Sequence, residues 1–280
     1  MLSGRLAMRN ALPLLLVLFL FAGILPAQEI SDPHITIGNS TQSDYRKLLS
    51  QAEAGDREAQ FRVAELYAFP EDGSVPKNAA ASREWMLKSA EQGYAPAQAM
   101  LGEMELGAAG DRGKAEVWLR RAAELGNTEG QFMLGVNYEN GKFGSPDYRE
   151  AFRWFRKAAE KGDPDAEVSL GEIYQDGEFV SQNYALAAKW YRKAAEHSPD
   201  MGGAGQGRNQ LGMLYEDGLG VSKNLVLAYM WYSLTQFREN LKEVESDMTR
   251  AQIAQARKMA VDWLKAHPAE HDTVAQQDRK

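Results

Sequence analysis

The sequence predicts an all-α solenoid of about five repeats, because the same landmarks return along the chain at a regular interval. Tryptophan recurs with steps of 33, 36, 36 and 41 residues, and a Leu-Gly pair followed by a Gly-rich turn precedes the last four tryptophans. A period of about 36 residues with small residues and aromatics at fixed offsets is typical of helical repeats, in which each unit buries its apolar faces against its neighbours. The landmarks are Trp85, Trp118, Trp154, Trp190 and Trp231, and the pairs Leu101-Gly102, Leu134-Gly135, Leu170-Gly171 and Leu211-Gly212, with Val63-Ala64 in the first copy.

Composition narrows the classes of function. Of the 280 residues, 44% are apolar and 25% charged, which is ordinary for a soluble globular protein. Cysteine is absent, which excludes disulfides, Cys-ligated zinc and thiol catalysis. The net charge of −7 argues against nucleic acid or an anionic membrane as partner. None of the four histidines lies in a metal-ligand spacing, so no cofactor and no metal are expected.

The first 27 residues have the features of a secretory signal peptide. Arg5 and Arg9 precede an apolar run over 11–25, and Pro26-Ala27 follows it. The run of about 15 residues is short for a membrane span, which needs about 20. We therefore expect export by a Sec signal with cleavage near Ala27 and a periplasmic or secreted protein. An uncleaved anchor in the inner membrane is the alternative.

The remaining elements follow in chain order. Residues 28–42 show no sustained period and are interpreted as a linker. A half-repeat helix over 44–54, capped by Ser43, opens a solenoid that spans 43–266. Its units are predicted at 57–93, 94–126, 127–162, 163–197 and 207–240, with 198–207 as an inserted connector. Two helices over 241–247 and 249–266 form a C-terminal cap, the second opened by a capping box of Thr249 and Gln252. The polar tail 267–280 is expected to be disordered.

Small and large residues alternate in a way that predicts tight packing between the two helices of a unit. The recurring glycines lie inside predicted helices, where Gly costs roughly 1 kcal/mol relative to Ala, a cost that close helix approach explains. A tyrosine follows three residues later in most units, whereas unit two has Glu105 at this position. The tryptophan and its neighbour in each second helix precede Ala-Ala pairs, so both aromatics are predicted to be core.

Taken together, these recurring positions resemble the Sel1-like repeat, a relative of the tetratricopeptide repeat. The motif is L-G-x-x-Y, then G-x-x-x-S/V, then W-Y/F-R-K-A-A-E-x-G, and it covers roughly residues 57–240. The match is strong in units three to five and weaker in unit two. The resemblance implies a right-handed superhelical α/α solenoid that serves as a protein-binding adaptor or regulator.

Catalytic motifs receive little support. One branch of the Sel1-like family, the Helicobacter cysteine-rich proteins, has been linked to penicillin binding and β-lactam hydrolysis, and residues 74–77 match S-x-x-K. Residues 181–183 and 222–224 match an S-x-N partner motif. However, these two segments and residues 74–77 all lie at the same position of the repeat, in the predicted loop between its two helices, and no K-T-G motif is present. The Gly-rich run 203–207 has no preceding strand and no G-K-S/T, so it is a connector rather than a phosphate loop. We expect no catalytic residues and a protein that is not an enzyme.

The first helix of each unit presents a biased face. In tetratricopeptide-type solenoids this helix lines the concave wall, and positions −6, −3, +1 and +4 from the recurring small residue share one helical face. Eight of the twenty residues at these positions are acidic and none is Lys or Arg, whereas the chain average would give about three acids. The positions hold Glu58, Phe61, Glu65, Ala68, Pro96, Ala99, Glu103, Leu106, Glu129, Phe132, Val136, Glu139, Asp165, Val168, Glu172, Gln175, Gln206, Asn209, Met213 and Glu216.

The sequence therefore predicts a non-enzymatic scaffold, adaptor or regulator in the bacterial cell envelope that holds a basic or extended protein segment in an acidic concave groove with an apolar floor. The competing interpretation of the acidic bias is helix propensity and solubility. A peptidoglycan- or polysaccharide-associated module that binds cell-wall glycan is the first alternative function, and a β-lactam-binding hydrolase is a remote one.

Overall fold

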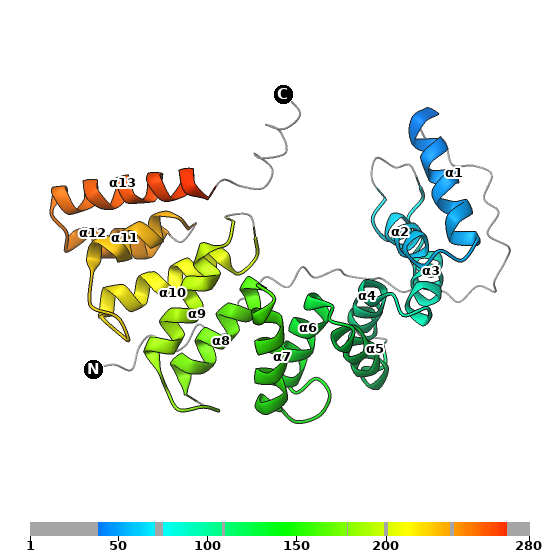
Figure 1. Ribbon diagram of the computed structural model, residues 1–280, viewed down its shortest axis with the longest axis horizontal. Coiled ribbons are helices and arrows are strands. Elements are labelled where there is room, and N and C mark those ends of the chain that lie inside the picture. The colour runs from blue at the N-terminus through cyan, green and yellow to red at the C-terminus, as the bar shows by residue number, and fades with distance from the viewer. Residues whose placement is uncertain are drawn as a thin grey trace. The chain divides into compact units, whose positions relative to one another are not determined.

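The computed structural model describes residues 39–70, 75–107, 110–177, 179–198, 201–235 and 238–267. The predicted signal peptide, the predicted linker up to residue 38, Ser74 and the tail from residue 268 lie outside the described residues. The described part is helical and contains no strand (Figure 1). Its helices are α1 (Asn39–Glu53), α2 (Arg57–Ala68), α3 (Ala79–Glu91), α4 (Ala95–Glu105), α5 (Arg112–Glu124), α6 (Thr128–Glu139), α7 (Tyr148–Glu160), α8 (Pro164–Asp176), α9 (Tyr184–Glu196), α10 (Ala204–Asp217), α11 (Leu225–Ser233), α12 (Arg238–Ser246) and α13 (Arg250–Ala266).

The helices stack in sequence order, which confirms the all-α solenoid. The pairs α2–α3, α4–α5, α6–α7, α8–α9 and α10–α11 pack within a unit, and each second helix packs against the first helix of the next unit. At the two ends, α1 packs against α2, and α12 and α13 pack against α11 (Figure 1). No helix in the described ranges is long and apolar enough to cross a membrane.

A glycine lies two residues after the last residue of α1, α3, α5 and α7. Gly55, Gly93, Gly126 and Gly162 have φ values of 96°, 76°, 87° and 83°, in the left-handed region that an L side chain rarely adopts. Each of these residues reverses the chain at a helix end. The next first helix begins two residues after each of these glycines, at Arg57, Ala95, Thr128 and Pro164.

Three helix starts differ from the sequence prediction. Helix α1 begins at Asn39 rather than at residue 44, so the last part of the predicted linker is helical. Helix α10 begins at Ala204, inside the segment predicted to be a connector, and α12 begins at Arg238 rather than at 241. In contrast, the capping box of Thr249 and Gln252 is present at the start of α13. Gly203, the residue before α10, makes no side-chain cap hydrogen bond, so no side-chain cap fixes the start of that helix.

The recurring glycines lie directly against the large residue that follows each tryptophan. A Cβ added at Gly135 would lie 2.5 Å from the ring of Phe155, and one at Gly212 would lie 2.6 Å from the ring of Tyr232. Gly102 and Gly171 meet Leu119 and Tyr191 in the same way. The close approach predicted from sequence is confirmed, and the residue after the tryptophan is its partner.

The tryptophans themselves are less uniformly core than predicted. Trp154 is 1% exposed, but Trp118 and Trp190 are only half-buried. The neighbouring position is fully buried in every unit, with Met86, Leu119, Phe155, Tyr191 and Tyr232 at 0% exposure. The core of each unit is therefore centred one residue after the tryptophan, because that side chain points at the glycine.

A polar side chain caps the start of every second helix. Asn183 Oδ1 accepts a hydrogen bond from Leu186 N at 3.0 Å, and Asn224 Oδ1 accepts one from Leu227 N at 3.0 Å. Asn78, Asp111 and Asp147 cap α3, α5 and α7 in the same manner. The asparagines of the two S-x-N matches thus have a structural role as helix caps.

Candidate partner-binding surface

The residues predicted at positions −6, −3, +1 and +4 lie on α2, α4, α6, α8 and α10, and we call their solvent-accessible members the first-helix surface. Contacts join α4 to α6 and α8 to α10, so the first helices of units two and three adjoin, as do those of units four and five. Ala99 and Val168 are 1% and 3% exposed and lie in the core, so they support the surface from beneath rather than line it. Ala68 is buried as well, at 8% exposure. The accessible members are Glu58, Phe61, Glu65, Pro96, Glu103, Leu106, Glu129, Phe132, Val136, Glu139, Asp165, Glu172, Gln175, Gln206, Asn209, Met213 and Glu216.

Two glutamates on successive first helices lie close enough to repel each other. Glu103 on α4 and Glu129 on α6 both reach solvent. Partial removal from water raises the pKa of Glu103, and the negative charge of Glu129 raises it further. Ionising both groups therefore costs free energy in the folded protein, and a cation placed between them would recover it.

In unit one, a basic side chain accompanies the acidic ones. This base, Arg62, lies outside the four positions that were chosen from the sequence. Burial raises the pKa of Glu65, and the charge of Arg62 partly offsets this. Arg62 also forms an ion pair with Glu58 at 2.8 Å, one helical turn away. The acidic character of the first-helix surface is consequently weaker on α2 than on α4, α6 and α8, which contain no Lys or Arg.

Two carboxylates in units four and five are held by neighbouring residues. Glu172 Oε1 accepts a hydrogen bond from Gln206 Nε2 of the next unit at 2.9 Å. Glu216 Oε2 accepts one from the Tyr232 hydroxyl at 2.7 Å. These bonds fix the direction of the two carboxylates.

Apolar side chains accompany the acids. The rings of Phe61 and Tyr94 lie 5.3 Å apart between centroids, and Phe132 lies 5.8 Å from the ring of Phe155. Both phenylalanines remain partly accessible, as do Val136 and Met213. Asn209 is tied to Asn240 by a hydrogen bond of 2.7 Å. The surface thus combines carboxylates with partly exposed apolar groups, the composition predicted for the groove.

A buried polar column runs under this surface, and the sequence interpretation missed it. The residue four positions before each recurring small residue is polar and buried in all five units. In four units its side chain donates to a carbonyl at the end of the preceding helix, which stabilises that helix end. The bonds join Gln60 to Ala52 O (3.0 Å), Gln98 to Ala90 O (2.9 Å), Gln131 to Ala123 O (2.9 Å) and Arg208 to Ala195 O (3.0 Å). A polar residue recurs four positions before each recurring small residue, and this regularity in the sequence could have revealed the column.

Unit four departs from this column because it has Glu167 there. His197 Nε2 lies 2.9 Å from Glu167 Oε2. Burial raises the pKa of Glu167, and His197 partly lowers it again. Arg208 donates from its Nη2 atom to the carbonyl of His197 at 2.7 Å and lies over the ring of Trp263, 4.6 Å from the centroid. Arg208 therefore connects the end of unit four, unit five and the terminal helix α13.

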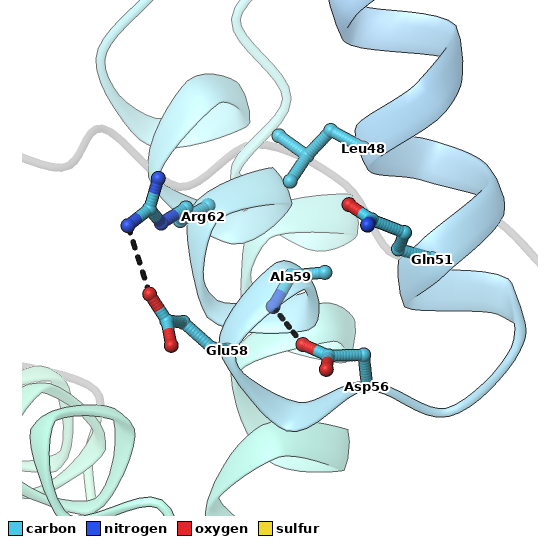
Figure 2. A pocket seen from close by; sticks show the side chains of 6 residues that line it. All are labelled: Leu48, Gln51, Asp56, Glu58, Ala59 and Arg62. Atoms are coloured by element: carbon cyan, nitrogen blue, oxygen red, sulfur yellow. Dashed lines mark hydrogen bonds and ion pairs between the residues drawn. The ribbon is translucent and has the colours of Figure 1, made fainter.

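A hollow of about 260 Å³ lies between α1 and α2, with Leu48 and Gln51 on one side and residues of α2 on the other (Figure 2). Its charged groups are engaged locally. Asp56 accepts a hydrogen bond from Ala59 N at 2.7 Å as the cap of α2, and Glu58 pairs with Arg62. The six lining residues include no nucleophile next to a base, so this hollow does not support a catalytic interpretation.

Fold and surface together define a class of protein, the α/α-repeat solenoid, whose stacked units present extended binding surfaces. Within that class, residues 57–94, 95–127, 128–163, 164–199 and 206–234 match the Sel1 repeat family, and the chain belongs to this family. The predicted units begin and end within one or two residues of these matches for the first four repeats.

Three relatives illustrate the similarity. The Sel1-repeat-containing protein YjcO of Escherichia coli is 33% identical over 107 residues, which cover 38% of this chain and 44% of that protein. The chain thus spans less than half the length of this curated relative. A crystal structure of a Sel1 repeat protein from Oxalobacter formigenes superposes with a TM-score of 0.60 at 25% identity, covering 82% of this chain and 96% of that one. A protective antigen of uropathogenic Escherichia coli superposes with a TM-score of 0.50 at 28% identity, covering 85% of this chain and 59% of that one.

Proposed function

We propose that this Sel1 repeat protein is a non-enzymatic scaffold or regulator that binds a basic, extended protein segment on its first-helix surface. The observation that carries the proposal is the repulsion that Glu129 on α6 exerts on Glu103 on α4, which adds to burial in raising the pKa of Glu103. Proximity of like charges lowers the stability of the fold, and a cationic side chain from a partner would relieve that repulsion.

The neighbouring side chains support a peptide as the ligand. Phe132 and Val136 lie on α6, the helix that also carries Glu129, and both are partly accessible. Apolar groups beside carboxylates suit a segment that alternates basic and apolar residues, because its cations meet the acids while its apolar side chains cover the floor.

The cell envelope is the proposed compartment, based on the signal-like segment at residues 1–27. Fractionation of cells that produce the full chain with a C-terminal tag tests this proposal. Release of a shortened tagged protein with the periplasmic fraction is expected. Retention of the full-length chain with the inner membrane would favour an anchor.

The binding proposal is tested by neutralising Glu65, Glu103 and Glu129 to Gln together. The matched control neutralises Glu53, Glu91 and Glu239, which are exposed elsewhere and give the same change in net charge. A photo-crosslinking amino acid at Val136 in each protein reports on the first-helix surface in living cells. We expect a crosslinked protein with wild type and control and its loss with the Glu65/Glu103/Glu129 variant, whose far-UV circular dichroism stays unchanged.

Two outcomes would contradict the proposal. Equal crosslinking of the variant and the control would mean that the carboxylates do not contribute to binding. Co-sedimentation with purified sacculi that is equally strong in all three proteins, without any protein crosslink, would favour the cell-wall module instead.

A further inference from the structure

The second helices carry a row of cations that the proposed function does not use. The residue three positions after the tryptophan is basic in units one to four, and its charged group lies over the tryptophan ring. The distances from the cation to the ring centroid are 4.3 Å for Lys88 over Trp85, 4.9 Å for Arg121 over Trp118, 4.1 Å for Lys157 over Trp154 and 4.5 Å for Lys193 over Trp190.

Three of these cations are exposed and form no ion pair within the described residues. Lys88 pairs with Glu84 at 2.8 Å, but Arg121, Lys157 and Lys193 have no carboxylate within 4.0 Å in the described part of the chain. Lys193 acts on Glu167 only at longer range. We call Arg121, Lys157 and Lys193 the cation row. Their contact with an aromatic face restricts side-chain motion, so less conformational entropy is lost when an anion binds.

The charges of the two helix sets differ in sign. In α5, α7 and α9, basic residues outnumber acidic ones by two in each helix, whereas α4, α6 and α8 contain carboxylates and no Lys or Arg. The cation row is therefore a surface of opposite character to the first-helix surface, although the chain carries a net charge of −7. A partner complementary to the cation row would be anionic.

The shape of the charge pattern selects among anionic partners. One helical turn beyond each cation stands an exposed glutamate, at Glu124, Glu160 and Glu196. These glutamates limit the positive surface around each cation to a small area, so a broad polyanion such as a lipid surface or a nucleic acid duplex would meet carboxylates as well as cations. A single chain whose carboxylates are spaced along its length can meet the cations one at a time.

We propose that the cation row binds an extended acidic protein segment whose Asp or Glu side chains meet Arg121, Lys157 and Lys193 in turn. Packed helices lie about 8–10 Å apart, and α6 and α8 each pack between two second helices, so successive cations are separated by roughly 10–20 Å. An extended chain covers that distance with about three to six residues. The segment therefore carries acidic residues spaced along its length rather than one compact cluster.

The test measures binding of a fluorescein-labelled peptide of about 18 residues with Glu at every third position and Ser elsewhere. The test variant of the full chain is Arg121→Gln with Lys157→Gln and Lys193→Gln. The control variant is Arg46→Gln with Lys142→Gln and Lys242→Gln, which removes the same charges from exposed sites away from the row. Fluorescence anisotropy is recorded for both variants and the wild type, with circular dichroism as the folding check.

We expect the test variant to bind about tenfold more weakly than wild type, as the loss of three exposed ion pairs implies, and the control to stay within about twofold. If the triple variant loses its fold, the single charge reversal Lys157→Glu replaces it and must also weaken binding. Equal affinity of test and control variants overturns the proposal, as does a peptide with Lys in place of Glu that binds equally well. Tighter binding of phosphatidylglycerol vesicles than of the peptide, or row-dependent dimerisation without peptide binding, also overturns it. Because none of these substitutions touches the first-helix surface, the result is independent of the proposed function.

Discussion

Glu105 accepts a hydrogen bond from the backbone N–H of Asp111, with 3.1 Å between Oε2 and N. In the other four units a tyrosine stands at this position, and in all four the N-cap residue of the second helix donates to its backbone carbonyl at 2.7–3.0 Å. Unit two has a shorter connection between its helices, so Asp111 N reaches the side chain of Glu105 instead. The exception in the sequence therefore compensates for the short loop.

Replacing Glu105 with the tyrosine of the other repeats is expected to destabilise the protein. Glu105→Tyr removes the acceptor of Asp111 N and the partner of Arg83, with which Glu105 forms an ion pair. We expect a loss of about 1–3 kcal/mol in the free energy of unfolding, measured by urea denaturation. Glu105→Gln keeps an acceptor and should cost less. If Glu105→Tyr instead raised the free energy of unfolding, tyrosine would be the favourable residue here as in the other repeats, whatever the loop length.

Glu105 also predicts a response to acid. Burial raises its pKa, but hydrogen bonds from Arg83 and Asp111 and the charge of Arg83 outweigh burial, and the pKa is lowered overall. A carboxyl group with a lowered pKa in the folded state stabilises that state above its unfolded pKa, and this contribution is lost as the pH falls through the folded value. The stability difference between wild type and Glu105→Gln should therefore shrink as the pH falls below about 4.5.

Glu103 predicts the opposite sign. Its pKa is raised, so its ionisation disfavours the folded state as the pH rises through and above the unfolded value. Glu103→Gln should therefore be more stable than wild type at pH 7, and the difference should disappear toward pH 4. Thermal unfolding midpoints measured across this range check the prediction. Greater stability of wild type at pH 7 would mean that the repulsion from Glu129 is compensated elsewhere.

Two glycine-to-alanine substitutions should have opposite effects. A methyl group at Gly171 would collide with the ring of Tyr191, which is 0% exposed and has no room to move, so Gly171→Ala should cost about 1–3 kcal/mol. A methyl group at Gly205, inside α10, meets no atom within 4 Å, and Gly205→Ala should stabilise the protein by about 0.5–1 kcal/mol. Chemical denaturation of the two variants in parallel separates steric contact from helix propensity.

Arg208 is expected to tolerate glutamine better than methionine. The side chain is 1% exposed and donates to the carbonyls of Ala195 and His197, while burial lowers its pKa to about 10. Arg208→Met leaves both carbonyls without this donor and should cost about 1–3 kcal/mol. Arg208→Gln can still donate to Ala195 O, as Gln98 does to Ala90 O, and should lose less. Equal loss in both variants would indicate that the contact with Trp263 is the dominant one.

The sequence by itself determined the repeat, the helices and the positions of close approach. Trp154 and Gly171 occur at fixed offsets because each unit must bury the same faces, and this regularity is visible without coordinates. The bias of acids to the first helices and of bases to the second helices is also a property of the sequence.

Only the tertiary structure decided which of these side chains meet. It removed Ala99 and Val168 from the surface, placed Phe155 rather than Trp154 against Gly135, and brought Glu103 within range of Glu129. It also showed the buried column of Gln98 and its equivalents, whose partners lie in the preceding helix. The physical reason is that period and composition are local quantities. Contacts between units depend instead on how far each loop lets one helix pair rotate and shift against the next.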